Sequence, residues 1–82
     1  IWDGGRVLAT HTELADRVTQ GDNARANDTH ATHVSGILIS AGQNPSVRGM
    51  AFGARLQAYD FENDDAEMSA AAASLLVSNH SY

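Results

Sequence analysis

An aspartate and a histidine, Asp3 and His30, stand at points in the sequence where their side chains could meet and carry out acid–base chemistry. Asp3 follows the apolar pair Ile1-Trp2, which is typical of the end of a strand, and two glycines directly after it permit a sharp turn. His30 begins a segment with helical periodicity. A carboxylate that fixes the tautomer of an imidazole enables that imidazole to take a proton from a nucleophile.

Helix geometry predicts where the imidazole lies. Residues advance about 100° each around a helix, so Ile37 lies about 20° and Val34 about 40° from the row of His30. We expect this apolar stripe to pack on a sheet and His30 to overhang the carboxyl ends of the strands, where Asp3 also lies. The helix N-terminus should disfavour the imidazolium and keep His30 neutral. The alternatives are an Asp3 that only caps a turn and a His30 that only begins a helix.

The elements that must position this pair alternate between strands and helices, which predicts crossovers and a mainly parallel sheet. They are expected to be a strand ending at 1–3, a loop at 6–28 with a turn at 12–15, a helix from Asp28 or Thr29 to Gly42, a strand at 54–61, a helix at 64–76 begun by a capping box of Asp64 and Glu67, and entry into a strand at 77–79.

Composition excludes several classes of protein. The chain has 82 residues, with 5 basic and 10 acidic side chains and a net charge of −5, so it lacks the basic face that nucleic-acid binding needs. It has no cysteine, which excludes disulfides and thiolate zinc sites. Its longest nearly apolar stretch, 68–77, is too short to cross a bilayer, so no membrane contact is expected. We interpret the chain as an internal piece of a larger protein.

Four motifs, in order, resemble those of the subtilisin-like serine proteases (subtilases, peptidase S8). The segment Trp2-Asp3-Gly4-Gly5 with His11-Thr12-Glu13-Leu14 resembles their aspartate motif, and His30-Ala31-Thr32-His33-Val34-Ser35-Gly36 resembles their histidine motif. The segments 49–54 and 78–82 resemble the Gly-Val-Ala-Pro-x-Ala element and the beginning of the substrate-pairing segment. Departures such as Ala31 for glycine, Ser35 for alanine and Phe52 for proline leave the Asp and His in place.

The resemblance implies that residues 1–82 are the N-terminal part of a subtilisin-like catalytic domain, an α/β fold with three α/β/α layers around a mainly parallel sheet. Asp3 would be the triad aspartate, His30 the general base, and Ser81 part of the strand that pairs with a polypeptide substrate. The remainder of the catalytic domain would be the partner of this chain. No cofactor is required for the chemistry, and the family is mostly secreted or otherwise extracytoplasmic.

The nucleophile is not among the serines present. Ser35 lies about 140° around the helix from His30, Ser40 is almost three turns away, and no serine stands in a Gly-x-Ser-x-Gly turn. The family's Gly-Thr-Ser motif would follow far downstream. We therefore expect the segment alone to be inactive, because an Asp–His pair without a serine has neither an acyl acceptor nor an oxyanion hole.

Other residues carry alternatives. A zinc-dependent hydrolase or metal-binding module would use His11, His30 and His33 with Glu13, although we expect His33 to be a buried structural histidine. In relatives the acid at Glu13 can help to hold a structural calcium, to which Gln43 and Asn44 could add oxygens. His80 should be exposed or line a cleft. A third alternative is a non-catalytic relative that keeps the fold as an interaction domain. The acidic residues of the second half should form a solvated edge and a helix cap, or else attract basic substrates: Asp60, Glu62, Asp64 and Asp65.

Overall fold

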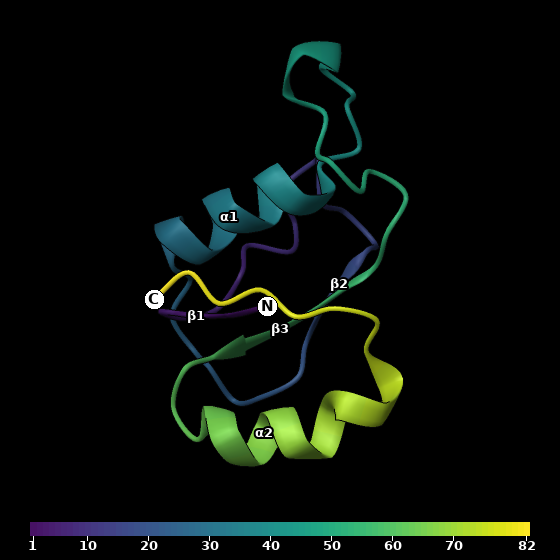
Figure 1. Ribbon diagram of the computed structural model, residues 1–82. Helices are drawn as coiled ribbons and strands as arrows, with labels where there is room; N and C mark the ends of the chain where they lie inside the picture. The colour runs from purple at the N-terminus through teal and green to yellow at the C-terminus, as the bar shows by residue number, and fades with distance from the viewer.

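Three short parallel strands form a sheet that lies between two helices in the computed structural model, which describes all of residues 1–82 (Figure 1). The strands are β1 (Trp2–Asp3), β2 (Val18–Gln20) and β3 (Leu56–Asp60), in the order β1-β3-β2. The helices are α1 (Thr29–Ile39) and α2 (Asp64–Ala71), with 3-10 turns at Pro45–Val47 and Ala72–Ser74. This arrangement confirms the expected α/β fold with a parallel sheet and agrees with part of a subtilisin-like sandwich.

The sheet differs from the prediction at both of its edges. Strand β2 was expected to be loop, because its own sequence has no period, and it is a strand because Val18 pairs with Leu56 of β3. The segment 77–79 is not a strand. It lies beside β1 through one bridge, Trp2 with His80, and the Trp2 N–H donates to the Asn79 carbonyl at 3.1 Å. Both differences reflect backbone pairing between distant segments.

Helix α1 begins where the sequence predicts, and its buried face is rotated from the expected one. Asp28 is the N-cap, and its Oδ1 accepts the Ala31 N–H at 2.7 Å. The helix ends at Ile39, before Gly42. The predicted stripe through Ile37 is wrong, since Ile37 is 56% exposed. The buried row is instead Ala31, Ser35 and Ile39, spaced by four residues.

Helix α2 begins without the predicted capping box. Its N-cap is Asn63, in the left-handed conformation (φ 62°) and without a side-chain cap bond. Glu67 turns away from the helix start and accepts a hydrogen bond from the Trp2 indole instead. The helix ends at Ala71 and tightens into the 3-10 turn, so the prediction that it extends to Leu76 is wrong.

The core lies between α1 and the sheet, and much apolar surface stays outside it. Ile1, Val7, Leu14, Ala31, Ile39 and Ala58 form the buried cluster. On the other side, Leu76 and Val77 are almost fully exposed. No helix has the length and apolar character that crossing a bilayer would require.

Candidate active site

Asp3 and His30 are in direct contact. Side chains alternate between the faces of a strand, so Trp2 points toward α2 and Asp3 toward α1. The Asp3 Oδ1 lies 2.7 Å from His30 Nδ1, in the first turn of α1. Asp3 is buried, with 2% of its surface exposed, whereas the His30 side chain is 58% exposed. The predicted meeting of the two side chains at the carboxyl end of β1 is confirmed.

Asp3 is held on one oxygen only. Its Oδ1 accepts the Gly4 backbone N–H at 2.7 Å in addition to the contact with His30. Its Oδ2 is buried and has no hydrogen-bond partner. With Nδ1–H donating to Oδ1, the His30 tautomer is set and Nε2 keeps its lone pair. The exposed ring can present that lone pair to a reacting group.

The Asp3 carboxylate raises the pKa of His30 above its ordinary value of 6.5, chiefly through the hydrogen bond and then through its charge, and Asp28 adds a smaller charge effect. The expectation that the helix N-terminus keeps His30 neutral is therefore corrected. A hydrogen-bonded carboxylate outweighs a helix-end dipole because it is a full charge in direct contact with the ring. A raised pKa makes the imidazole a better proton acceptor.

Glu13 fastens the segment that follows α1. Its Oε2 accepts the N–H groups of Gly42 at 2.7 Å and Gln43 at 3.1 Å, and its Oε1 accepts that of Asn44 at 2.8 Å. These bonds, that from Asn44 above all, lower the pKa of Glu13. Calcium needs several oxygens around it, and here N–H groups surround the carboxylate. The donors at Glu13 therefore do not fit calcium, and its contacts are structural.

The histidines proposed as zinc ligands do not converge. His11, Glu13 and His33 line one pocket of about 620 Å³ but form no cluster of ligand atoms. The His33 side chain is exposed and makes no hydrogen bond, so the prediction that it is buried is wrong. In the described chain the one group of three candidate ligands is Asp3, Asp28 and His30, within 4.8 Å of one another. The Asp3 carboxylate already contacts His30, and the Asp28 carboxylate already accepts the Ala31 N–H as the cap of α1.

The C-terminal segment lies beside β1. Through the bridge at Trp2, His80 and Ser81 come next to the strand that carries Asp3. Both side chains are exposed, as expected for His80, and Ser81 Oγ accepts a hydrogen bond from the Asn79 amide at 3.0 Å. No serine hydroxyl bonds to His30, and Ser35 is buried with its hydroxyl donating to the Ala31 carbonyl.

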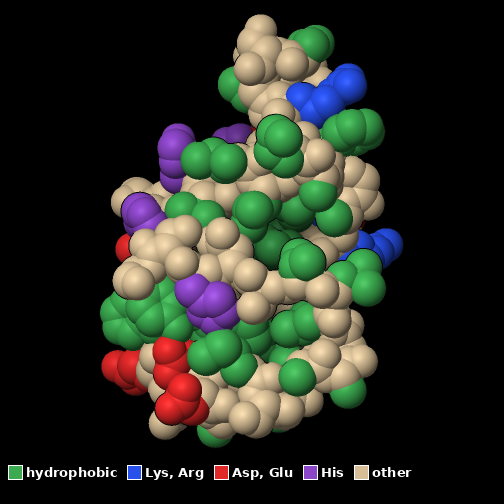
Figure 2. All heavy atoms as spheres, viewed as in Figure 1, with side chains coloured by type: hydrophobic (Ala, Val, Ile, Leu, Met, Phe, Trp, Pro, Cys, Tyr) green, Lys and Arg blue, Asp and Glu red, His purple; other side chains and the backbone are tan.

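Figure 2 shows most of the visible Asp and Glu side chains gathered at the lower left of the molecule, and one more higher up at its left edge. Glu62 and Asp65 are exposed, as a solvated edge requires. Asp64 accepts the Tyr82 hydroxyl, which raises the pKa of Tyr82 to about 12. The helix-cap part of the prediction is wrong, because Asn63 occupies the cap.

Sequence reasoning missed the contacts of Trp2. This residue is fully buried, its ring stacks on Tyr59 and His80, and its Nε1–H donates to Glu67. A tryptophan one residue before a candidate catalytic aspartate was the available signal. Its partners could not be identified, because they come from β3, α2 and the C-terminal segment.

Comparison with known proteins supplies a family. Residues 6–79 match the family model of the subtilase family (peptidase S8). The matched span includes His30 and begins three residues after Asp3. The structure places Asp3 in contact with His30. No curated protein matched the chain, and no solved structure did. The match covers most of the chain and agrees with the parallel α/β fold, so this chain belongs to the subtilase family.

Proposed function

We propose that the protein is a serine-type endopeptidase and that this chain supplies the Asp and His of its triad. The observation that carries the proposal is the 2.7 Å contact between Asp3 Oδ1 and His30 Nδ1, in a chain of the subtilase family. In this proposal residues 1–82 are the N-terminal part of the catalytic domain. The serine and the oxyanion hole come from sequence outside these residues.

The chemistry follows from the two ring nitrogens of His30. Nε2 takes the proton of the serine hydroxyl as its oxygen attacks the scissile carbonyl. Asp3, bound to Nδ1, stabilises the imidazolium that results, and the raised pKa of His30 favours this proton transfer. The imidazolium then gives its proton to the leaving amine. In this proposal the polypeptide substrate pairs with the backbone near Ser81. His80 and Ser81, which lie beside β1, are exposed and therefore accessible to a substrate.

The exposed apolar surface supports a partner from the same protein. A groove of about 610 Å³ lies between α1, β3 and the C-terminal segment, and most of its lining residues are apolar, among them Leu38, Leu56 and Val77. Apolar patches of this kind mark sites where another protein surface packs. We assign this groove to the rest of the catalytic domain. As in most of the family, the protein would act outside the cytoplasm.

The test uses the full-length protein and a His30→Ala variant. We expect the variant to lose hydrolysis of a casein substrate and labelling by a fluorophosphonate, a reagent that modifies activated serines, while circular dichroism stays unchanged. His33→Ala, one turn along the same helix and exposed, is the matched control and should keep both. Hydrolysis that survives in folded His30→Ala, or wild-type hydrolysis that a fluorophosphonate leaves unchanged, would contradict the proposal.

A further inference from the structure

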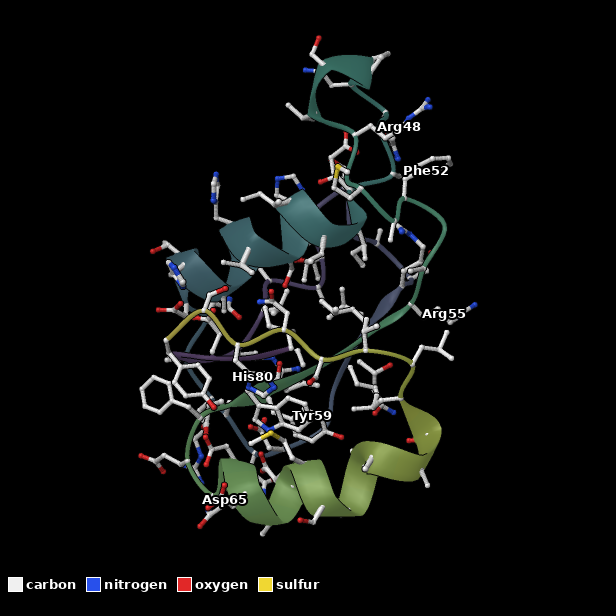
Figure 3. The ribbon with its side chains drawn as sticks, viewed as in Figure 1. Arg48, Phe52, Arg55, Tyr59, Asp65 and His80 are labelled. Atoms are coloured by element: carbon white, nitrogen blue, oxygen red, sulfur yellow. The ribbon has the colours of Figure 1, made fainter.

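Trp2 is the centre of an aromatic ladder across three adjacent backbone segments. Its ring lies 4.6 Å from that of Tyr59 with planes 6° apart, and 5.3 Å from that of His80 with planes 9° apart. These separations are close to the spacing of about 4.8 Å between neighbouring strands. Each ring therefore stacks on the one beside it, and Figure 3 shows Tyr59 and His80 on the side of the sheet that faces α2.

Glu67 fixes the edge of the central ring. The Trp2 Nε1–H donates to Glu67 Oε2 at 3.0 Å, so the buried indole has the polar partner that it needs. Glu67 comes from α2, and burial raises its pKa, with the charges of Asp22, Asp60 and Asp64 acting in the same direction against the indole bond. The indole is thus restrained on one face by β3, on the other by the segment that carries His80, and along its edge by α2.

The backbone of Trp2 and its neighbour Ile1 is also fixed, and it leads directly to Asp3. The Trp2 N–H donates to the Asn79 carbonyl at 3.1 Å, and the Tyr59 N–H donates to the Ile1 carbonyl at 3.0 Å. Asp3 itself has a buried Oδ2 without a partner, so no side chain other than His30 orients its carboxylate. The position of that carboxylate therefore depends on the strand on which it stands.

We propose that the ladder of Tyr59, Trp2 and His80, locked by Glu67, is a positioning device for the active site. It keeps the Asp3 carboxylate within hydrogen-bonding distance of His30 Nδ1 and holds the segment 79–81 beside β1. The inference rests on the proposed function, because it assumes that Asp3 and His30 act in peptide hydrolysis and that segment 79–81 pairs with the substrate. Trp2, His80 and Glu67 are positioning residues, because none of them touches the reacting atoms.

Paired variants of the full-length protein test the device. Glu67→Leu removes the acceptor of the indole N–H, and Glu67→Gln keeps one. His80→Ala removes one face of the stack, and His80→Phe keeps it. Misplacement of a catalytic group by about 1 Å costs up to about 100-fold in rate, so we expect the two disruptive variants to lower kcat by about 10- to 100-fold. The two conservative variants should recover most of that loss.

The pH profile separates positioning from a merely structural role. Loosening the Asp3–His30 bond lowers the pKa of His30, so the acid limb of kcat/KM should move to lower pH in Glu67→Leu and His80→Ala. The exposed Asp65→Asn, on the same helix as Glu67, should change neither quantity. If Glu67→Leu does not fold, the acid limb of kcat/KM in His80→Ala gives the answer, because kcat of that variant also depends on the substrate-pairing segment 79–81.

Two results overturn different statements. Folded disruptive variants with unchanged kcat and an unchanged acid limb would overturn the positioning role, even if they unfold at lower temperature. Activity that persists in His30→Ala would instead overturn the proposed function.

Discussion

Replacing Asp3 by asparagine should disable the His30 base while nearly preserving its shape. The Asp3 Oδ1 accepts two hydrogen bonds, each 2.7 Å long, from the Gly4 N–H and from His30. An asparagine oxygen at that position keeps both bonds but places an NH2 group at the buried site of Oδ2, which offers no partner. The opposite orientation aims the NH2 group at the Gly4 N–H and turns the His30 tautomer around.

In either orientation the asparagine should lower both the free energy of unfolding and the turnover. A buried amide without a partner costs about 1–3 kcal/mol of unfolding free energy. Loss of the carboxylate that stabilises the imidazolium, or the wrong tautomer, lowers the turnover of a triad by about 10⁴, which corresponds to about 5 kcal/mol of activation free energy. The loss of rate should therefore far exceed what the loss of stability explains.

The assay is peptide hydrolysis by full-length wild type and Asp3→Asn over a range of pH, with urea unfolding of both. Because Asp3 raises the pKa of His30, the acid limb of activity should also move to lower pH in the variant. His33→Asn is the control for an added amide on the same side of the fold. Asp3→Asn turnover within tenfold of wild type at every pH would refute the reasoning.

Three further predictions concern stability. The folded-state pKa of His30 is raised above 6.5, so the stabilisation that its charged form gains from the carboxylate is fully present below pH 6.5 and is lost as the pH rises through the folded-state pKa. The urea midpoints of wild type and His30→Gln should therefore differ more at about pH 5.5 than at about pH 9. An equal difference at the two pH values would contradict this prediction. Glu13→Gln puts an NH2 group against backbone N–H donors, whichever way the amide turns, so hydrogen exchange of residues 42–44 should become faster while that of β3 does not. Leu14→Ala should cost about 2–5 kcal/mol of unfolding free energy, because Leu14 is 1% exposed. The exposed Ile37→Ala should stay within about 0.5 kcal/mol, and equal costs for the two variants would mean that the core is elsewhere.

The predictions from sequence that succeeded depend on neighbouring residues or on the direction of the chain. Asp28 caps α1 because a side chain three residues before Ala31 reaches its N–H. The turn at 12–15 and the alternation of strands and helices likewise follow from local composition. The meeting of Asp3 with His30 follows from chain direction, since a strand end and a helix start share the same edge of a parallel sheet.

Predictions that needed the orientation of whole elements failed. The periodicity of α1 allowed a buried face through Ile37, and packing on the sheet selected the row of Ala31, Ser35 and Ile39. Ala31 and Ser35 on that row are small and fully buried. His33 is exposed for the same reason, because it stands on the opposite side of the helix.

The sequence by itself determined the parallel α/β layers, the start of α1 and the two groups that meet at the carboxyl end of β1. Only the tertiary structure decided that Glu67 serves Trp2 rather than its own helix, and that Glu13 holds three N–H groups of a segment about thirty residues away. The reason is physical: a carboxylate binds whichever donors folding brings within reach. For these two residues the donors come from elements far away along the chain.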